Sequence, residues 1–313
     1  MKRRTHIIAA SLLAIAAAAP QTSAAEKINF LYNASASFAA MFVAKDQGFL
    51  EKRGLDVDFA LAQSGAVMPP ALLAGSAQIA APTAAVMVQA NEQGLDLVII
   101  ANTSVYPSPP NSGGVVARND SGIKTARDLM GRKVGLPSLG GIFEVLMRKW
   151  VKANGADDRQ VQWVEVQIRQ MADALKSGLV DAVVPVQPFY SRVLDSKAGY
   201  DIGDFETVVP AGTMPVVYAS TRSWAKDHAA AVKAFRDALD EAIRFIRDPA
   251  HGAAVRETIA RYTKLPPEAA ATLTIPSNLE VKARPEGMVF WIEAMREQGF
   301  THGSPDPKSF IWP

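Results

Sequence analysis

Small polar residues and glycines occupy the turns that precede several expected helices, and such turns can hold an anion. The stretches YNASAS (32–37), PT (82–83) and PSLGG (137–141) are of this kind. The first turn of a helix presents unpaired N–H groups and partial positive charge, so several converging helix N-termini would bind an anion or a strong hydrogen-bond acceptor. The candidate ligand-binding residues are Tyr32, Asn33, Ser37, Phe38, Gln63, Ser64, Gly65, Pro82, Thr83, Ser138, Gly140, Gln187 and Phe189.

A plainer interpretation exists for each member of this set. Its Ser and Thr residues can be simple helix N-caps, and its aromatic residues can belong to the core instead of stacking on a flat ligand. Four arginines near the same turns could clamp a carboxylate or sulfonate bidentately, or could be solvated: Arg118, Arg169, Arg192 and Arg222. The ligand hypothesis therefore depends on convergence of the set and not on one residue.

Catalytic and metal-binding patterns are weak. Cysteine is absent, which excludes a thiolate metal site, a Cys nucleophile and a disulfide. His228, His251 and His302 are spaced for neither a metal pair nor a catalytic triad. The stretch GLPSLGG (135–141) lacks the G-x-S-x-G spacing of a nucleophile elbow. We therefore expect a binding protein that uses no catalytic residue, metal or cofactor, and not an enzyme.

The N-terminal 25 residues have the order of a secretory signal peptide. A basic stretch (2–4) precedes an apolar stretch (7–19), and the small residues 23–25 form a cleavage site. Removing the segment takes three of the 33 basic residues and leaves 30 against 31 acidic ones, so the net charge of +2 belongs to the leader. We expect cleavage near Ala25 and a soluble periplasmic monomer that is not membrane-embedded and binds no nucleic acid.

One short sequence pattern occurs twice in the chain. The stretch ALLAGSAQIAAPTA (71–84) has a counterpart in ALKSGLVDAVVPVQP (174–188), and the elements expected around each also repeat. Each half alternates as β-α-β-α-β-α, which requires mostly parallel strands with helices on the sheet faces. Ligands bind beyond the carboxyl ends of such strands. The predicted fold is therefore α/β, with two lobes and a ligand cleft between them.

The expected domains follow from this repeat. A stretch rich in Pro, Gly and Ser (104–122) is the expected first crossing between lobes, and the return is expected around 208–220. A long amphipathic helix and the tail SFIWP (309–313) should then pack against a lobe. The predicted boundaries are 1–25 for the signal peptide, 26–117 for the first part of lobe I, 118–213 for lobe II, and 214–313 for the return to lobe I with the C-terminal helices.

Five stretches, in this order, resemble the periplasmic solute-binding proteins of ABC importers, in the group that handles sulfonates, nitrate and thiamine-precursor pyrimidines. They are FVAKDQGFLEKRGLDVDF (42–59), ALLAGSAQIA (71–80), GLDLVIIA (94–101), DLMGRKVGL (128–136) and ALKSGLVDAVV (174–184). The resemblance implies a type II periplasmic-binding fold, no catalysis, and an inner-membrane permease with its ATPase as partners.

Several functions remain open at this stage. A small organic anion, sulfonate or carboxylate, is the first choice of ligand, and a pyrimidine or other flat heterocycle is the second. A related pyrimidine synthase shares the fold, but it is intracellular and has a cysteine-rich motif that this chain lacks. The effector domain of a transcription regulator would need a DNA-binding helix-turn-helix, whereas the expected signal peptide occupies the N-terminus.

Overall fold

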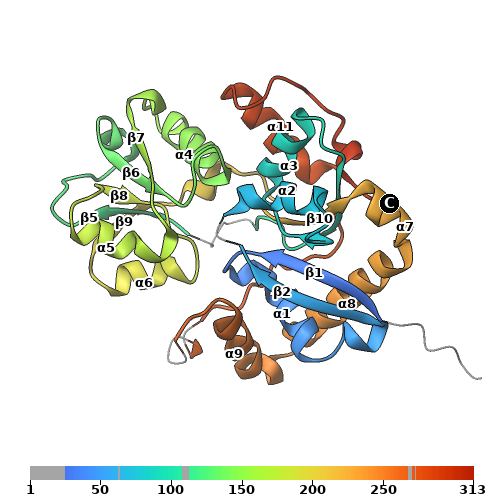
Figure 1. Ribbon diagram of the computed structural model, residues 1–313. Helices are drawn as coiled ribbons and strands as arrows, with labels where there is room; N and C mark the ends of the chain where they lie inside the picture. The colour runs from blue at the N-terminus through green and yellow to red at the C-terminus, as the bar shows by residue number, and fades with distance from the viewer. Residues whose placement is uncertain (1–24, 63, 108–112, 267–269, 272) are drawn as a thin grey trace, which may run out of the picture.

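Two lobes, each built on its own five-stranded sheet, lie side by side in the computed structural model (Figure 1). The structure describes residues 25–62, 64–107, 113–266, 270–271 and 273–313. The expected signal peptide lies outside the described residues, except for Ala25. Within the described ranges, no helix is long and apolar enough to cross a membrane.

The sheet of the first lobe has the strand order β2-β1-β3-β10-β4. Strand β1 pairs in parallel with β2 and β3, whereas β10 is antiparallel to both β3 and β4. The strands are β1 (Glu26–Tyr32), β2 (Leu55–Leu61), β3 (Ile79–Ala80), β4 (Leu97–Asn102) and β10 (Val217–Thr221). Helices α1 (Ala39–Asp46), α2 (Met68–Leu73) and α3 (Ala84–Glu92) connect the parallel strands.

The sheet of the second lobe repeats this arrangement in the order β7-β6-β8-β5-β9, with β5 as its antiparallel strand. Its strands are β5 (Val115–Arg118), β6 (Lys133–Leu136), β7 (Gln162–Glu165), β8 (Ala182–Val183) and β9 (Gly199–Gly203). Helices α4 (Ile142–Ala153), α5 (Met171–Lys176) and α6 (Phe189–Asp195) follow the parallel strands. The β-α-β-α-β-α order predicted for each half is confirmed. The two repeated sequence stretches correspond to α2-β3 in the first lobe and α5-β8 in the second.

Each crossing between the lobes leads into an antiparallel strand, β5 in the second lobe and β10 in the first. Strand β5 lies in the second sheet, so Val115, Val116 and Ala117 belong to lobe II and not to lobe I, where the sequence pattern had placed them. Hydrophobicity alone does not show whether an apolar strand is the last strand of one lobe or the first strand of the next. The return occurs at β10, where the chain pairs again with β3 and β4.

Within the described residues, the helices of the C-terminal third pack mainly on the first lobe (Figure 1). They are α7 (Arg222–Asp227), α8 (Ala229–Arg247), α9 (Gly252–Tyr262) and α11 (Glu286–Glu297). Helix α8 buries the apolar face expected from its spacing, including Val232, Phe235 and Leu239. The tail packs against β4, because Phe310 is buried and the Trp312 N–H donates to the carbonyl of Ile99.

Candidate ligand-binding site

The turns singled out in the sequence follow the carboxyl ends of parallel strands in both lobes. In the first lobe they follow β1, β2 and β3, and in the second they follow β6 and β8. The side-chain amide of Gln89, on α3, donates to the carbonyl of Gly140, in the turn before α4, at 2.8 Å. Phe189, at the start of α6, packs in the apolar core of the first lobe. Helix α3 and the core of the first lobe therefore contact the turns of the second lobe directly.

Tyr32 and Phe38 are core residues of the first lobe. Phe38 is 1% exposed and Tyr32 is 4% exposed, and both rings pack edge-on against Phe42. The hydroxyl of Tyr32 donates to the backbone carbonyl of Tyr262 at 3.2 Å, and burial raises the pKa of Tyr32. The plainer interpretation, an aromatic core, fits both residues better than stacking on a ligand.

The turn after β1 is capped two residues earlier than expected. The Ser35 side chain accepts a hydrogen bond from the Ser37 N–H at 3.2 Å and caps the 3₁₀ helix Ala36–Phe38. The plainer interpretation as an N-cap therefore does not hold for Ser37, because YNASAS offers two serines and the chain turns at the first. The half-buried Asn33 makes no side-chain hydrogen bond within the described part of the chain. Its amide is thus available to a ligand.

The turns after β2 and β3 precede helices as predicted. Gln63 lies outside the described residues, and Ser64 precedes the 3₁₀ helix Gly65–Val67 without accepting a capping hydrogen bond. Thr83 is confirmed as the N-cap of α3, since its hydroxyl accepts from the Val86 N–H at 3.3 Å. Pro82 is buried, and its carbonyl accepts from the Val217 N–H on β10.

The turn after β6 is built by two glycines. Helix α4 begins after Gly141, so the plainer interpretation as an N-cap does not hold for Ser138. Gly140 has a φ of +69°, a left-handed conformation that glycine adopts without strain, and it delays the helix start by one turn. The Gly140 N–H donates to Glu144 Oε2 at 2.7 Å, while a Cβ at Gly141 would lie 2.7 Å from Ser138 Oγ.

The turn after β8 joins the two lobes. Gln187 Oε1 accepts a hydrogen bond from the Ser191 hydroxyl at 3.0 Å, so that oxygen is already engaged. Phe189 is 3% exposed and belongs to the apolar core of the other lobe, which makes it a contact between lobes. The role of Phe189 in ligand binding stays a prediction, and the sequence pattern did not anticipate this contact between lobes.

The cationic side chains near these turns are mostly engaged elsewhere. Arg118 pairs with Asp120 and Asp181, and Arg222 pairs with Asp96. Arg169 donates to the carbonyl of Thr263 at 3.1 Å, so it too joins the lobes. The turn residues themselves carry no formal charge, which leaves backbone N–H groups, hydroxyls and amides as the groups available to a ligand.

Tyr190 supplies a further hydroxyl close to the first crossing. Burial and, secondarily, the neighbouring Asp201 carboxylate raise the pKa of Tyr190 to about 12, so the phenol keeps its proton at neutral pH. A Cβ at Gly114 would lie 2.8 Å from both the Tyr190 ring and Asp201 Oδ1. Only glycine therefore fits at the point where the chain enters the second lobe.

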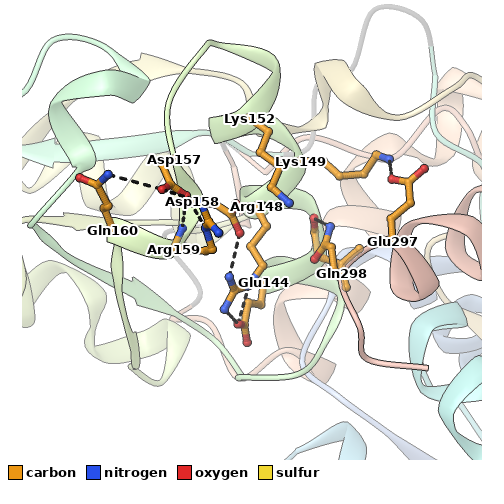
Figure 2. Close-up of polar contacts among 11 residues, drawn as sticks. Glu144, Arg148, Lys149, Lys152, Asp157, Asp158, Arg159, Gln160, Glu297 and Gln298 are labelled. Atoms are coloured by element: carbon orange, nitrogen blue, oxygen red, sulfur yellow. Dashed lines mark hydrogen bonds and ion pairs between the residues drawn. The ribbon is translucent and has the colours of Figure 1, made fainter. Parts of the chain in front are cut away.

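A second contact between lobes joins α4 to α11 (Figure 2). Lys149 Nζ lies 2.7 Å from Glu297 Oε2, and the Gln298 amide donates to the carbonyl of Val145 at 2.9 Å. On the other face of α4, Arg148 bridges Glu144 and Asp158, and these buried carboxylates fix the helix within its own lobe. Sequence reasoning missed these contacts and Gln89, because polar residues on amphipathic helices are indistinguishable from solvated ones until the lobes are placed.

No metal centre is found among the residues that the structure describes: no group of three or more His, Cys, Asp or Glu side chains could hold an ion. The arrangement can bind a small molecule between turns through neutral donors and acceptors. It brings no candidate nucleophile and general base together in hydrogen-bond contact at these turns.

One protein family and several individual proteins are similar in sequence to this chain. A family described as "NMT1/THI5 like" matches residues 35–251. A putative thiamine biosynthesis protein of Haemophilus influenzae is 31% identical over 163 residues, which are 51% of this chain and 50% of that protein. A putative binding protein of Brucella abortus is 24% identical over 99% of this chain and 97% of its own length.

Solved structures share the fold at low sequence identity. The periplasmic aliphatic sulphonate-binding protein SsuA of Escherichia coli has a TM-score of 0.74 and 23% identity, covering 92% of this chain and 97% of its own. The alkanesulfonate-binding protein SsuA of Xanthomonas axonopodis, bound to MOPS, has a TM-score of 0.77 and 18% identity, covering 93% and 99%. The periplasmic nitrate-binding protein NrtA of Synechocystis has a TM-score of 0.74 and 17% identity, covering 91% and 84%. The predicted periplasmic-binding fold is thus confirmed.

Proposed function

Starting from the fact that the chain belongs to the NMT1/THI5-like family, we propose that it is the substrate-binding component of an ABC-type importer. It captures a small organic anion, a sulfonate or carboxylate, between its lobes and delivers it to an inner-membrane permease with its ATPase. The protein is exported, is cleaved near Ala25, acts in the periplasm as a monomer and performs no catalysis. The domain limits become 26–114 for the first part of lobe I and 115–213 for lobe II.

The observation that supports this proposal is the contact of helix α3 in the first lobe with the turn that starts α4 in the second. Helix α3 begins at Thr83 in the first lobe, and α4 begins at Gly141 in the second. The hydrogen bond from Gln89 to Gly140 ties these two helices together. The N-terminus of each helix carries partial positive charge, so an oxyanion bound there would be stabilised without a formal cation.

A flat heterocycle such as a thiamine-precursor pyrimidine is the second candidate ligand. The name of the Haemophilus influenzae relative favours it. Tyr32 and Phe38 are buried in the first lobe's core, which removes two aromatic rings that would have held a flat ring system. The anion therefore stays the first choice.

A thermal screen tests the ligand class. Ligand that binds only the folded state stabilises it by about 2.7 kcal/mol at a hundredfold excess over Kd. Each kcal/mol raises Tm by roughly 2–4 °C in domains of 150–250 residues, so binding is measurable. We expect sulfonates or carboxylates to shift Tm in the parent, and aminopyrimidines to shift it less.

The variant Thr83→Asp places a negative charge at the proposed anion site. Asp is as good an N-cap as Thr, so α3 should stay intact. Thr221→Asp is the matched control, since Thr221 caps α7 in the same way, accepting from the Trp224 N–H. Strand β10 runs antiparallel to β3, which puts Thr221 at the opposite end of the sheet from Thr83.

We expect Thr83→Asp to abolish the ligand-induced shift and Thr221→Asp to retain it. Small-angle scattering of the parent should show a smaller radius of gyration with ligand than without, as the lobes close about the two crossings. Binding of an anion to Thr83→Asp with parental affinity would exclude the helix N-terminus mechanism. An unchanged radius at saturating ligand would exclude lobe closure.

A further inference from the structure

The second lobe carries a hollow of about 220 Å³ that the proposed function does not use. It lies between the 3₁₀ helix Ile168–Gln170, α5 and α6. Its walls include Arg169, Lys176 and Arg192 as basic side chains, and Asp173 as the acidic one. Every residue of its lining comes from positions 168–196, so the hollow belongs to one lobe and does not require the lobes to meet.

The charges around this hollow are unbalanced. Neither the three basic side chains nor Asp173 forms an ion pair with any residue in the described ranges. Arg169 donates only to the Thr263 carbonyl, and Arg192 lies over the Phe189 ring at 5.9 Å from its centroid. Three cations and one carboxylate leave two positive charges around one concave surface.

Other basic side chains of this protein show what the usual arrangement is. Arg148 is held by Glu144 and Asp158, and Arg53 is held by Glu241. These two partly buried arginines meet carboxylates, as expected for a charge that loses solvent, whereas Arg169, Lys176 and Arg192 are exposed and keep their contact with solvent. The hollow between α5 and α6 gathers cations without supplying carboxylates of equal number.

We propose that this hollow is a second binding site, for a small dianionic oxyanion of the phosphate or sulfate type, separate from the site between the lobes. Two guanidinium groups can each bind such a group through paired N–H donors, and Lys176 adds a mobile point charge. A dianion neutralises the two excess positive charges. The volume accommodates one oxyanion with a small substituent.

The position of Arg169 links this site to the contact between lobes. Its guanidinium uses one N–H group on Thr263 and keeps the others for the hollow. Phe189, which also lines the hollow, packs in the first lobe's core. Arg169 and Phe189 therefore connect the hollow to the contact between lobes.

Isothermal titration with inorganic phosphate and sulfate, at constant ionic strength set by sodium chloride, tests the site. The double variant Lys176→Gln/Arg192→Gln removes two cations that are exposed on helix surfaces and form no ion pair with a described residue, although Arg192 also lies over the Phe189 ring. Arg132→Gln/Lys226→Gln is the matched control, because both residues are exposed, form no ion pair with a described residue, and lie outside the hollow. The two double variants have the same net charge.

We expect saturable binding of one dianion per chain, weakened at least about tenfold in Lys176→Gln/Arg192→Gln and less than about twofold in the control pair. Thr83→Asp should bind phosphate as the parent does, which separates this site from the one between the lobes. Equal weakening in both double variants, equal competition by chloride, or absence of saturable binding would each overturn the proposal.

The source of the oxyanion is resolved by a second arm of the same experiment. Vesicles of phosphatidic acid, whose phosphomonoester headgroup can carry two negative charges, and of phosphatidylcholine are sedimented with the parent and both double variants. Capture by anionic vesicles that Lys176→Gln/Arg192→Gln alone loses assigns a lipid headgroup as the source. Phosphate binding without vesicle capture assigns a free anion.

Discussion

The two lobes have the same topology but different interiors. Both sheets place three parallel strands beside an antiparallel strand and a fifth edge strand, in the orders β2-β1-β3-β10-β4 and β7-β6-β8-β5-β9. The first lobe fills one face of its sheet with aromatic rings, among them Phe30, Phe42 and Tyr218. The corresponding face of the second lobe is aliphatic, with Met171, Leu175 and similar side chains at its centre.

The difference arises from what covers each sheet. Helices α8 and α9 pack over α1 in the first lobe and enclose large rings. The second lobe has only the short helices α5 and α6 on the matching face, and the hollow lies between them. The topology shared by the two lobes therefore sets where the turns of the candidate site lie. The helices added to the first lobe make its core more tightly packed than that of the second.

The largest expected effect contrasts the two cores. Phe30→Ala, at a fully buried position that contacts several rings, should destabilise the protein by about 3–5 kcal/mol. Leu175→Ala, also fully buried, should cost about 2–3 kcal/mol because the thin second lobe can collapse around a smaller cavity. Native-state hydrogen exchange, read separately on β1 and β8, measures the loss in each lobe.

The variants Phe30→Leu and Leu175→Val serve as controls that keep most of the apolar volume, and each should cost less than its alanine partner. A larger effect of Leu175→Ala than of Phe30→Ala would mean that the second lobe, not the first, is the more tightly packed. That result would contradict the inference that the first lobe is packed more tightly than the second.

Sequence reasoning predicted the topology better than the site. The period of the apolar residues and the repeated Gly positions determine strands, helices and lobes, since these depend on local pattern. The antiparallel strands were not distinguished, because β5 and β10 are defined by partners far along the chain. Ser37 and Ser138 were assigned as caps from residue type, yet the neighbouring Ser35 and the left-handed Gly140 decide where those helices start.

A smaller and equal effect is expected at the repeated glycines. Gly75 and Gly178 follow α2 and α5 with φ values of +68° and +71°, and an added Cβ would meet no atom within 4 Å at either. Replacement by alanine should therefore cost only the left-handed strain of about 1–2 kcal/mol, reduced by the lower entropy of the unfolded chain. Urea denaturation should give similar losses for Gly75→Ala and Gly178→Ala.

The corresponding asparagine variants should lose less, because Asn tolerates the left-handed region. Unequal losses for the two alanine variants would show that the lobes use their matching turns differently. Equal stability losses for the two glycine variants, together with unequal losses for the two core variants, would show that the lobes share their turns but differ in their packing.

The smallest expected effect concerns the capping box before the 3₁₀ helix Ala126–Leu129, a turn that among the described elements occurs in the second lobe and not in the first. The Asp128 carboxylate accepts from the backbone N–H groups of Lys124 and Thr125 and from the Thr125 hydroxyl, at 2.9–3.0 Å. These hydrogen bonds, the one from Lys124 foremost, lower the pKa of Asp128. A lowered folded-state pKa stabilises the folded protein above the unfolded value of about 4, and that contribution is lost as pH falls through the folded value.

Asp128→Asn should therefore lower Tm at neutral pH by less than either glycine variant does, since the carboxylate is exposed to solvent. The difference from the parent should shrink as pH falls below about 4, where the parent's own carboxyl becomes protonated. Asp56→Asn, at an exposed position on β2 of the first lobe that forms no hydrogen bond or ion pair with the described residues through its side chain, is the control and should change Tm little at any pH. Thermal melts of the three proteins across this pH range measure the effect. A pH-independent loss in Asp128→Asn would mean that shape, and not the carboxylate's charge, closes this turn of the second lobe.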